Sequence, residues 1–146
     1  MNTTFSKFLL MFFTALICCN YTSAQTSPEG IWRTVDDATK QPKSHVQIEK
    51  RNGKYYGKII QLLEGATTKV CGPCPGDRKG KSLEGMEILW DLSPYENYWS
   101  YGGIIDPKTG KIYKCSVWLE GQDKLIVRGY IGISLLGRSQ TWERVK

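Results

Sequence analysis

The fold is decided by the stretch Arg128-Gly129-Tyr130-Ile131-Gly132-Ile133-Ser134-Leu135-Leu136-Gly137-Arg138-Ser139-Gln140-Thr141-Trp142-Glu143-Arg144-Val145. It predicts the last β-hairpin of a sheet, because an apolar alternation ends at Val127 and a new alternation follows the glycines. Side chains of a strand alternate between its two faces, so Gln140, Trp142 and Arg144 share one face. The glycines between the strands allow the positive φ angles that a tight or bulged turn needs.

The first strand signal is Gly30-Ile31-Trp32. If it pairs with the last strand, the sheet closes and no edge is left open. Asn52-Gly53 predicts a two-residue hairpin, and Asp106 to Gly110 predicts another short turn. Short connections favour an antiparallel, up-and-down all-β barrel of about eight strands. We expect these strands over residues 30–35, 43–50, 55–63, 85–92, 99–105, 113–119 and 125–130, followed by the closing strand.

The N-terminal residues are typical of a secretory signal peptide. Lys7 supplies a positive charge, Phe8 to Ile17 form an apolar run, and Thr22-Ser23-Ala24 is a small-residue cleavage site. The apolar run is too short for a comfortable membrane span. We therefore expect a signal peptide over residues 1–24, a single β-barrel domain over residues 25–146 without a membrane span, and a periplasmic or secreted protein.

The chain is basic, with a formal net charge of +6. Such a balance can indicate binding to nucleic acid or to anionic lipid. Here the basic residues are dispersed over strands, and the one cluster, Arg78-Lys79-Gly80-Lys81, lies in a predicted loop. Export would also remove the protein from most nucleic acid. We expect no nucleic-acid partner, and the sequence identifies no protein partner.

Several segments together carry a resemblance. The Gly30-x-Trp32 start and Arg144 resemble the lipocalin and fatty-acid-binding class, in which the first-strand Trp packs at the closed barrel end under an Arg of the last strand. Over nearly the whole chain after the leader, the sequence resembles the secreted bacterial family called domain of unknown function 2147 (DUF2147). The resemblance implies a lipocalin-like barrel closed by Gly30, Trp32 and Arg144, and it brings no catalytic residues. The segments that carry it are Gly30-Ile31-Trp32, Asp36-Asp37, Lys43-Ser44, Tyr56-Gly57-Lys58-Ile59, Cys71-x-x-Cys74, Gly85-Met86, Gly103 to Pro107, Gly110 to Cys115, and Arg128-Gly129-Tyr130 through Arg144.

Cys71-Gly72-Pro73-Cys74 has the residues of the thioredoxin active site, but Pro75 and Gly76 follow at once and no helical pattern continues. A local disulfide between Cys71 and Cys74 is the favoured interpretation in an oxidising compartment. Zinc bound by these two cysteines with Cys115 and His45 is a minority alternative. Alternation counts against it, because Cys115 is predicted to face the interior and His45 the opposite side of its strand. We predict no metal and no cofactor.

Nucleophilic catalysis through a histidine would have to use His45, since the chain has one histidine. Its neighbour Ser44 lies on the other strand face, so the two cannot act as base and nucleophile. Asp36-Asp37 lacks the ligand alternation of a calcium loop and is typical of a turn. We therefore predict no catalytic residues and a protein that is not an enzyme; an enzyme, either a thiol oxidoreductase or a hydrolase, is the weakest of the alternatives.

The interior of the barrel is the predicted ligand-binding region. A barrel of about eight strands is either filled by side chains or holds one small ligand. The first hypothesis is a small amphipathic or hydrophobic ligand, its head group held by Tyr113, Gln140 and Arg128. The second is a structural or protein-interaction module of the cell envelope with a filled barrel. The predicted interior residues are Met86, Ile88, Trp90, Tyr113, Val117, Leu125, Val127, Gln140 and Trp142.

Overall fold

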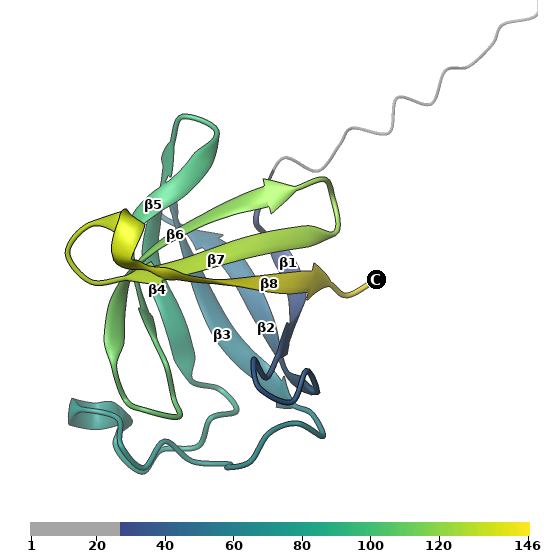
Figure 1. Cartoon of the computed structure of the whole chain (residues 1–146), viewed down its shortest axis with the longest axis vertical. Helices are drawn as coiled ribbons and strands as arrows, with labels where there is room; N and C mark the ends of the chain where they lie inside the picture. Colours follow the sequence, from purple (N-terminus) through teal and green to yellow (C-terminus); the bar gives the residue numbers. More distant parts are fainter. Residues whose placement is uncertain (1–26) are drawn as a thin grey trace, which may run out of the picture.

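The structure is a computed structural model that describes residues 27–146. The predicted signal peptide, residues 1–24, lies outside the described residues. Eight antiparallel strands, each bonded to its neighbours in sequence, form a closed barrel (Figure 1). The predicted all-β up-and-down barrel is therefore confirmed. The elements are β1 (Gly30–Val35), β2 (Pro42–Arg51), β3 (Lys54–Leu62), η1 (Gly76–Arg78), β4 (Glu87–Tyr95), β5 (Tyr98–Ile105), β6 (Ile112–Glu120), β7 (Lys124–Tyr130), η2 (Ser134–Leu136) and β8 (Arg138–Arg144).

The barrel closes through a short seam between β1 and β8, where Trp32 pairs with Arg144 and Arg33 with Glu143. The Trp32 side chain is fully buried, and its Nε1 donates a hydrogen bond of 2.8 Å to the carbonyl oxygen of Pro28. The Arg144 guanidinium lies 4.1 Å from the centre of the Trp32 ring. Gly30 has φ 130°, and a Cβ there would lie 2.6 Å from Arg144 Nη1, so this approach requires glycine.

The end of the barrel at which Trp32 and Arg144 lie is packed with side chains. Ile48, Leu92, Val117 and Leu125 are almost wholly buried there. Gly57 lies beside Ile48, because a Cβ at that position would be 3.6 Å from Ile48 Cγ1, and it would also be 3.1 Å from Leu89 Cβ and 3.3 Å from Val46 Cγ1. Little free space therefore remains in this half of the interior.

Strand β4 departs from the simple alternation that the sequence suggests. Asp91 has φ 56°, and the pairing of β3 with β4 shifts register on either side of Gly57. Leu89 and Leu92 are consequently both fully buried although they are three residues apart. Trp90 does not share the inner face with Ile88: its ring covers the outer side of Gly103, where a Cβ would lie 2.5 Å from it, and Arg78 lies 4.8 Å above it. The interior position predicted for Trp90 is wrong, because the register shift between Gly57 and Lys58 leaves Ile88 and Leu89 both buried and places Trp90 on the outer face.

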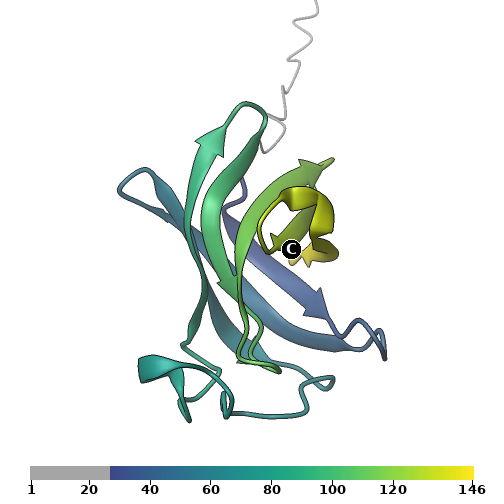
Figure 2. The same cartoon turned by 60° about the vertical axis from the view of Figure 1, so that its left-hand side comes forward.

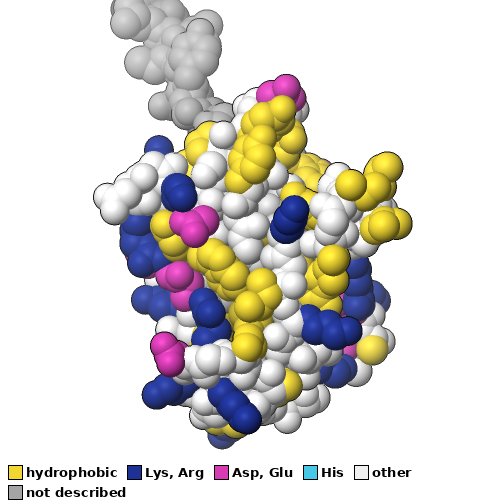
Figure 3. Space-filling model, turned by 90° about the vertical axis from the view of Figure 1, so that its left-hand side faces the viewer, with side chains coloured by type: hydrophobic (Ala, Val, Ile, Leu, Met, Phe, Trp, Pro, Cys, Tyr) yellow, Lys and Arg dark blue, Asp and Glu magenta, His cyan; other side chains and the backbone are white. Residues whose placement is uncertain are grey.

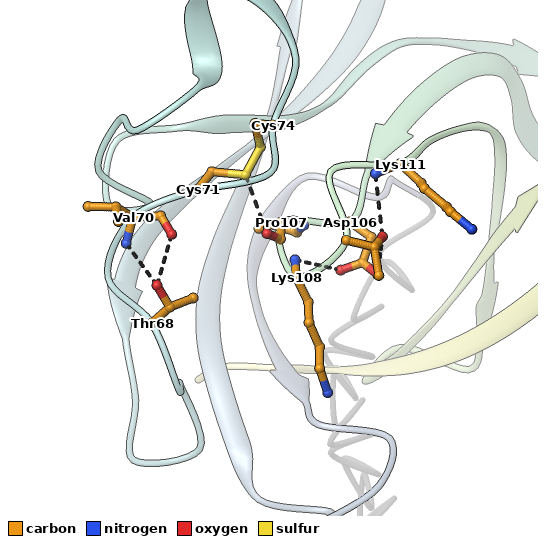
Figure 4. The surroundings of a disulfide bond; sticks show 9 residues. Thr68, Val70, Cys71, Cys74, Asp106, Pro107, Lys108 and Lys111 are labelled. Carbon is orange, nitrogen blue, oxygen red and sulfur yellow. Dashed lines mark hydrogen bonds between the residues drawn. A yellow bond between two sulfur atoms is a disulfide. The ribbon is translucent and has the colours of Figure 1, made fainter.

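The longest loop, residues 63–86, passes below the turn that joins β5 to β6 (Figure 2). It contains the Cys71–Cys74 disulfide, which confirms the predicted pairing. Cys71 Sγ lies 3.3 Å from the carbonyl oxygen of Pro107 (Figure 4). Gly110 lies so close to the backbone between the two cysteines that a Cβ there would lie 2.0 Å from the carbonyl oxygen of Pro73. The disulfide thus packs the loop against the β5–β6 turn.

Candidate ligand-binding site

The half of the barrel opposite the Trp32 seam is hollow. Its cavity has a volume of about 580 Å³, within the range of small-molecule sites in proteins. Four connections surround its mouth: the β1–β2 turn, the long loop, the β5–β6 turn and the β7–β8 loop. The cavity lies at this end because large buried side chains, among them Trp32, Ile48, Leu92 and Leu125, fill the other.

The deeper wall of the cavity is largely aliphatic. Ile59, Ile88, Ile105 and Val127 are buried and contribute to it from four different strands. Leu83 of the long loop is also buried and covers the wall from the mouth side. A hydrocarbon group placed here would be removed from water, which stabilises binding by roughly 25 cal/mol for each Å² buried.

A polar strip crosses this aliphatic wall along β8. Trp142 Nε1 donates to Gln140 Oε1 at 3.4 Å, and Gln140 Nε2 donates to Asp37 Oδ2 at 2.6 Å. Arg138 Nη2 forms a salt bridge of 2.7 Å with the same Asp37 oxygen. Trp142, Gln140 and Arg138 point into the cavity because they alternate along one strand. The strip therefore leads from a buried ring to an exposed guanidinium and offers donors and acceptors to a polar head group.

Two buried hydroxyl groups lie on the β1 and β2 side of the cavity. Thr34 Oγ1 and Ser44 Oγ are 2.8 Å apart and share a hydrogen bond. Both residues line the cavity, and their exposed fractions are 6% and 4%. Each hydroxyl group can form a further hydrogen bond with a ligand, because it has one donor proton and two acceptor lone pairs. They add a second polar point to the aliphatic wall.

The acidic groups at the mouth are held in turns. Asp36 Oδ1 accepts hydrogen bonds from the backbone N–H groups of Thr39 and Ala38, which lower the pKa of its carboxyl group. Asp106 accepts a similar bond of 2.9 Å from the backbone N–H of Lys108 (Figure 4). Within residues 27–146, Lys43 and Lys108 form no salt bridge, although both line the cavity. The mouth therefore presents two ammonium groups that can meet a ligand.

The residues predicted for the interior fall into three groups. Ile88, Tyr113, Val127, Gln140 and Trp142 line the cavity. Met86, Val117 and Leu125 are buried but do not line it. Trp90 is half-buried on the outer face of the sheet. Arg128 does not reach the cavity either, because its Nε donates to the carbonyl oxygen of Ser134 at 2.8 Å and its Nη1 donates to Ser139 Oγ at 2.9 Å.

The sequence interpretation missed Asp37, Thr34, Ser44 and Arg138 as cavity residues. Asp37 looked like part of a turn, which it is, but the turn also folds over the open barrel end. Arg138 could have been found, since it continues the alternation of Gln140, Trp142 and Arg144. For Thr34 and Ser44 the signal was weaker, because short polar side chains are as common outside a sheet as inside.

The residues of the alternative chemistries do not come together. Cys71 and Cys74 are joined to each other, and Cys115 is buried inside the barrel. His45 lies on the outer face, where Nδ1 is 3.1 Å from Gln61 Oε1. In the described part of the chain, no three His, Cys, Asp or Glu side chains are grouped as metal ligands would be. Of the helices in residues 27–146, none has the length and apolar character needed to cross a membrane.

The profile of the family described as "Uncharacterized protein conserved in bacteria (DUF2147)" matches residues 30–144, from the first strand to the last. The chain belongs to this family. Its fold is similar to that of protein HP1028 from the human pathogen Helicobacter pylori, whose structure is described as belonging to the lipocalin family. The TM-score is 0.72 at 24% sequence identity, over 82% of this chain and 84% of that one. The lipocalin-like architecture of this DUF2147 protein is thus supported by a solved structure. No curated relative matches the sequence.

Proposed function

We propose that this DUF2147 protein binds one small amphipathic molecule in the open half of its barrel. The observation that carries the proposal is the cavity of about 580 Å³ with an aliphatic wall crossed by the Gln140–Asp37–Arg138 strip. Apolar sites with a few converging polar groups are typical of small-molecule binding. The lipocalin-like fold fits the same role, and the predicted leader fits binding outside the cytoplasm, in the periplasm or after secretion.

The two regions of the cavity suit two parts of one ligand. A hydrocarbon tail gains from contact with Ile59, Ile88 and Val127, which have no polar side-chain atoms. A head group that accepts hydrogen bonds can meet the remaining N–H groups of Arg138 and Gln140, or the Lys43 and Lys108 ammonium groups at the mouth. A wholly apolar molecule would leave this strip without water and without a partner, which costs free energy.

A pair of ligands tests the amphipathic character directly. A medium-chain fatty acid should bind with one-to-one stoichiometry and quench tryptophan fluorescence, because Trp142 lies in the cavity wall. The alkane of equal length should bind more weakly. Gln140→Met, which keeps the side-chain volume, should reduce the preference for the acid while leaving alkane binding in place. Trp142→Phe should remove most of the quenching without preventing binding.

Two results would contradict the proposal. One is the absence of any saturable binding across a panel of acids, alcohols and sterol-like molecules. The other is quenching that survives Trp142→Phe unchanged, because it would place the ligand at another tryptophan. A barrel that binds nothing would favour the alternative, a structural or protein-interaction module of the envelope.

A further inference from the structure

The loop that joins β7 to β8 carries four exposed aliphatic side chains. Ile131, Ile133, Leu135 and Leu136 are 65%, 60%, 83% and 77% exposed. Figure 3 shows apolar side chains projecting at the right-hand edge of the molecule, where this loop lies. We call residues 131–136 the apolar loop. Large apolar side chains gathered on one projection are unusual on a soluble surface and indicate contact with another apolar phase.

Part of the backbone of the apolar loop is hydrogen-bonded within the protein. The N–H of Leu136 donates to the carbonyl oxygen of Ile133, and the N–H of Gly137 to that of Ser134, both at 3.2 Å. Arg128 donates to the carbonyl oxygens of Ser134 and Leu135 at 2.8 and 3.4 Å. A segment can enter hydrocarbon only when its polar backbone groups are satisfied internally. The carbonyl groups of Ile133, Ser134 and Leu135 meet this condition, and the other polar backbone groups of the loop can stay among the lipid head groups.

The side chains of the loop offer little to a protein partner. Residues 131–136 contain no aromatic, amide or charged side chain, whereas protein interfaces depend on aromatic residues and Arg as anchors. The loop also projects, so it fits a fluid apolar phase better than a flat complementary surface (Figure 3). These features favour lipid over protein.

The chain on both sides of the loop carries basic side chains that an anionic lipid surface attracts. Between Asp123 and Glu143 the sequence has Lys124, Arg128 and Arg138 but no acidic residue. Arg138 is paired with Asp37, and the cavity mouth, which the loop borders through Ile131 and Leu136, carries Lys43 and Lys108 beside Asp36 and Asp106. Figure 3 shows Lys and Arg side chains below the projecting apolar group. Basic residues near a membrane surface are attracted by anionic head groups.

We propose that the apolar loop docks the protein on membranes that contain anionic lipids, with Ile133 and Leu135 entering the boundary between head groups and acyl chains. Docking through this loop places the cavity mouth against the lipid surface, because Ile131 and Leu136 line the cavity. An amphipathic molecule could then pass between bilayer and barrel without crossing water. The docking itself does not depend on what the cavity holds.

Vesicle flotation tests the docking. The chain from Gln25 onward is suitable, because residues 27–146 contain all eight strands and their core, and the apolar leader would itself bind lipid. It should float with vesicles of phosphatidylglycerol and phosphatidylethanolamine, less with pure phosphatidylcholine, and less as salt is raised. Ile133→Ser with Leu135→Ser should lower the partition coefficient by about tenfold for each side chain, or about a hundredfold together.

The matched control is Ile60→Ser with Ile112→Ser, since these isoleucines are exposed on strands β3 and β6. It should float like the wild type, and both double variants should keep the wild-type melting temperature.

No flotation of the wild type, equal loss in the control, or binding to phosphatidylcholine as strong as to the anionic vesicles would overturn the proposal. So would a dimer in sedimentation velocity that dissociates in the Ile133→Ser, Leu135→Ser variant without any vesicle binding. Fatty-acid binding by the loop variant should be unchanged, which separates failure of docking from failure of the cavity function.

Discussion

Trp32 closes the barrel with its whole side chain, so its loss should be costly. The ring is 0% exposed, its Nε1 is hydrogen-bonded, and the Arg144 guanidinium stacks on it. Trp32→Ala should lower the free energy of unfolding by about 3–5 kcal/mol, the usual cost of truncating a large buried aromatic. Arg144→Ala should cost less, because the carbonyl oxygens it contacts can turn to water. Urea denaturation of both variants measures the difference, and a Trp32→Ala protein as stable as the wild type would refute the assigned role.

Cys115 should make the protein less stable at alkaline pH. Burial raises the pKa of its thiol from about 9 to about 12. Above pH 9 the unfolded chain releases this proton while the folded chain keeps it, so unfolding becomes more favourable as pH rises. The loss should approach about 1.4 kcal/mol per pH unit between pH 9 and 12. Below pH 9 the thiol is protonated in both states and contributes no pH dependence.

Comparison with Cys115→Ala separates this effect from the titration of tyrosine and lysine. The alanine variant should be less stable at neutral pH, because it leaves a small cavity, but its stability should fall less steeply above pH 9. The slope of unfolding free energy against pH is the quantity to compare. Parallel slopes in the two proteins would show that Cys115 is not held as a buried thiol.

At the scale of single elements, the disulfide should act locally. The disulfide closes a ring of only four residues, Cys71 to Cys74. The resulting loss of entropy in the unfolded chain raises the free energy of unfolding by only about 2 kcal/mol. Cys71→Ala with Cys74→Ala should therefore leave the barrel folded. Hydrogen–deuterium exchange should rise in residues 69–83, where Cys71 and Leu83 donate backbone bonds to Lys81 and Lys69, and in the β5–β6 turn. Faster exchange spread evenly over the strands would contradict a local role.

The elements differ in how far the sequence predicted them. Strands β6, β7 and β8 keep a regular register, so the alternation of Tyr113, Val127, Gln140 and Trp142 correctly placed them on the inner face. Strand β4 does not, because its pairing with β3 shifts register twice, once between Glu87 and Leu89 and once between Leu89 and Leu92, where Asp91 takes a left-handed conformation. Asp tolerates this conformation better than most residues, but one Asp in a strand is too weak a signal to predict a bulge.

The β7–β8 connection shows a second limit. The glycines predicted a tight or bulged turn, whereas the chain forms a longer loop with the short helix η2. Gly132 has φ 73°, so the expected need for positive φ is met there. The guanidinium of Arg128 stabilises this longer loop, because it donates hydrogen bonds to the carbonyl groups of Ser134 and Leu135. A contact between a strand side chain and a loop backbone has no pattern in the sequence.

On the scale of the whole molecule, one half of the barrel is filled and the other is hollow. Substitutions at two inward-facing glycines, Gly57 and Gly129, test which half of the barrel has free space. Gly57→Ala would press a methyl group against Leu89 and Val46 and should cost about 1–3 kcal/mol. At Gly129 an added Cβ meets Tyr113 and Ile104 only at 3.4 Å or more, beside the cavity. Gly129→Leu should therefore fill free space and leave the melting temperature unchanged or higher. A large loss of stability in Gly129→Leu would mean that this half is packed too.

Whether such a barrel is filled could not be decided from the pattern of residues alone. Val117 and Leu125 were natural candidates for a ligand site, yet they lie in the packed half with Gly57. Alternation tells which face a side chain lies on, but not its height in the barrel. That height depends on strand tilt and register, which arise from all eight pairings together.

The central claim, that the hollow half of the barrel holds an amphipathic molecule, is tested most directly by native mass spectrometry. The protein should be purified without detergent from the cells that naturally make it. We expect a population heavier than the polypeptide by one ligand per chain, absent from a Gly129→Leu variant prepared in the same way. Wild-type protein that carries only its polypeptide mass, or a ligand retained undiminished by Gly129→Leu, would contradict the claim.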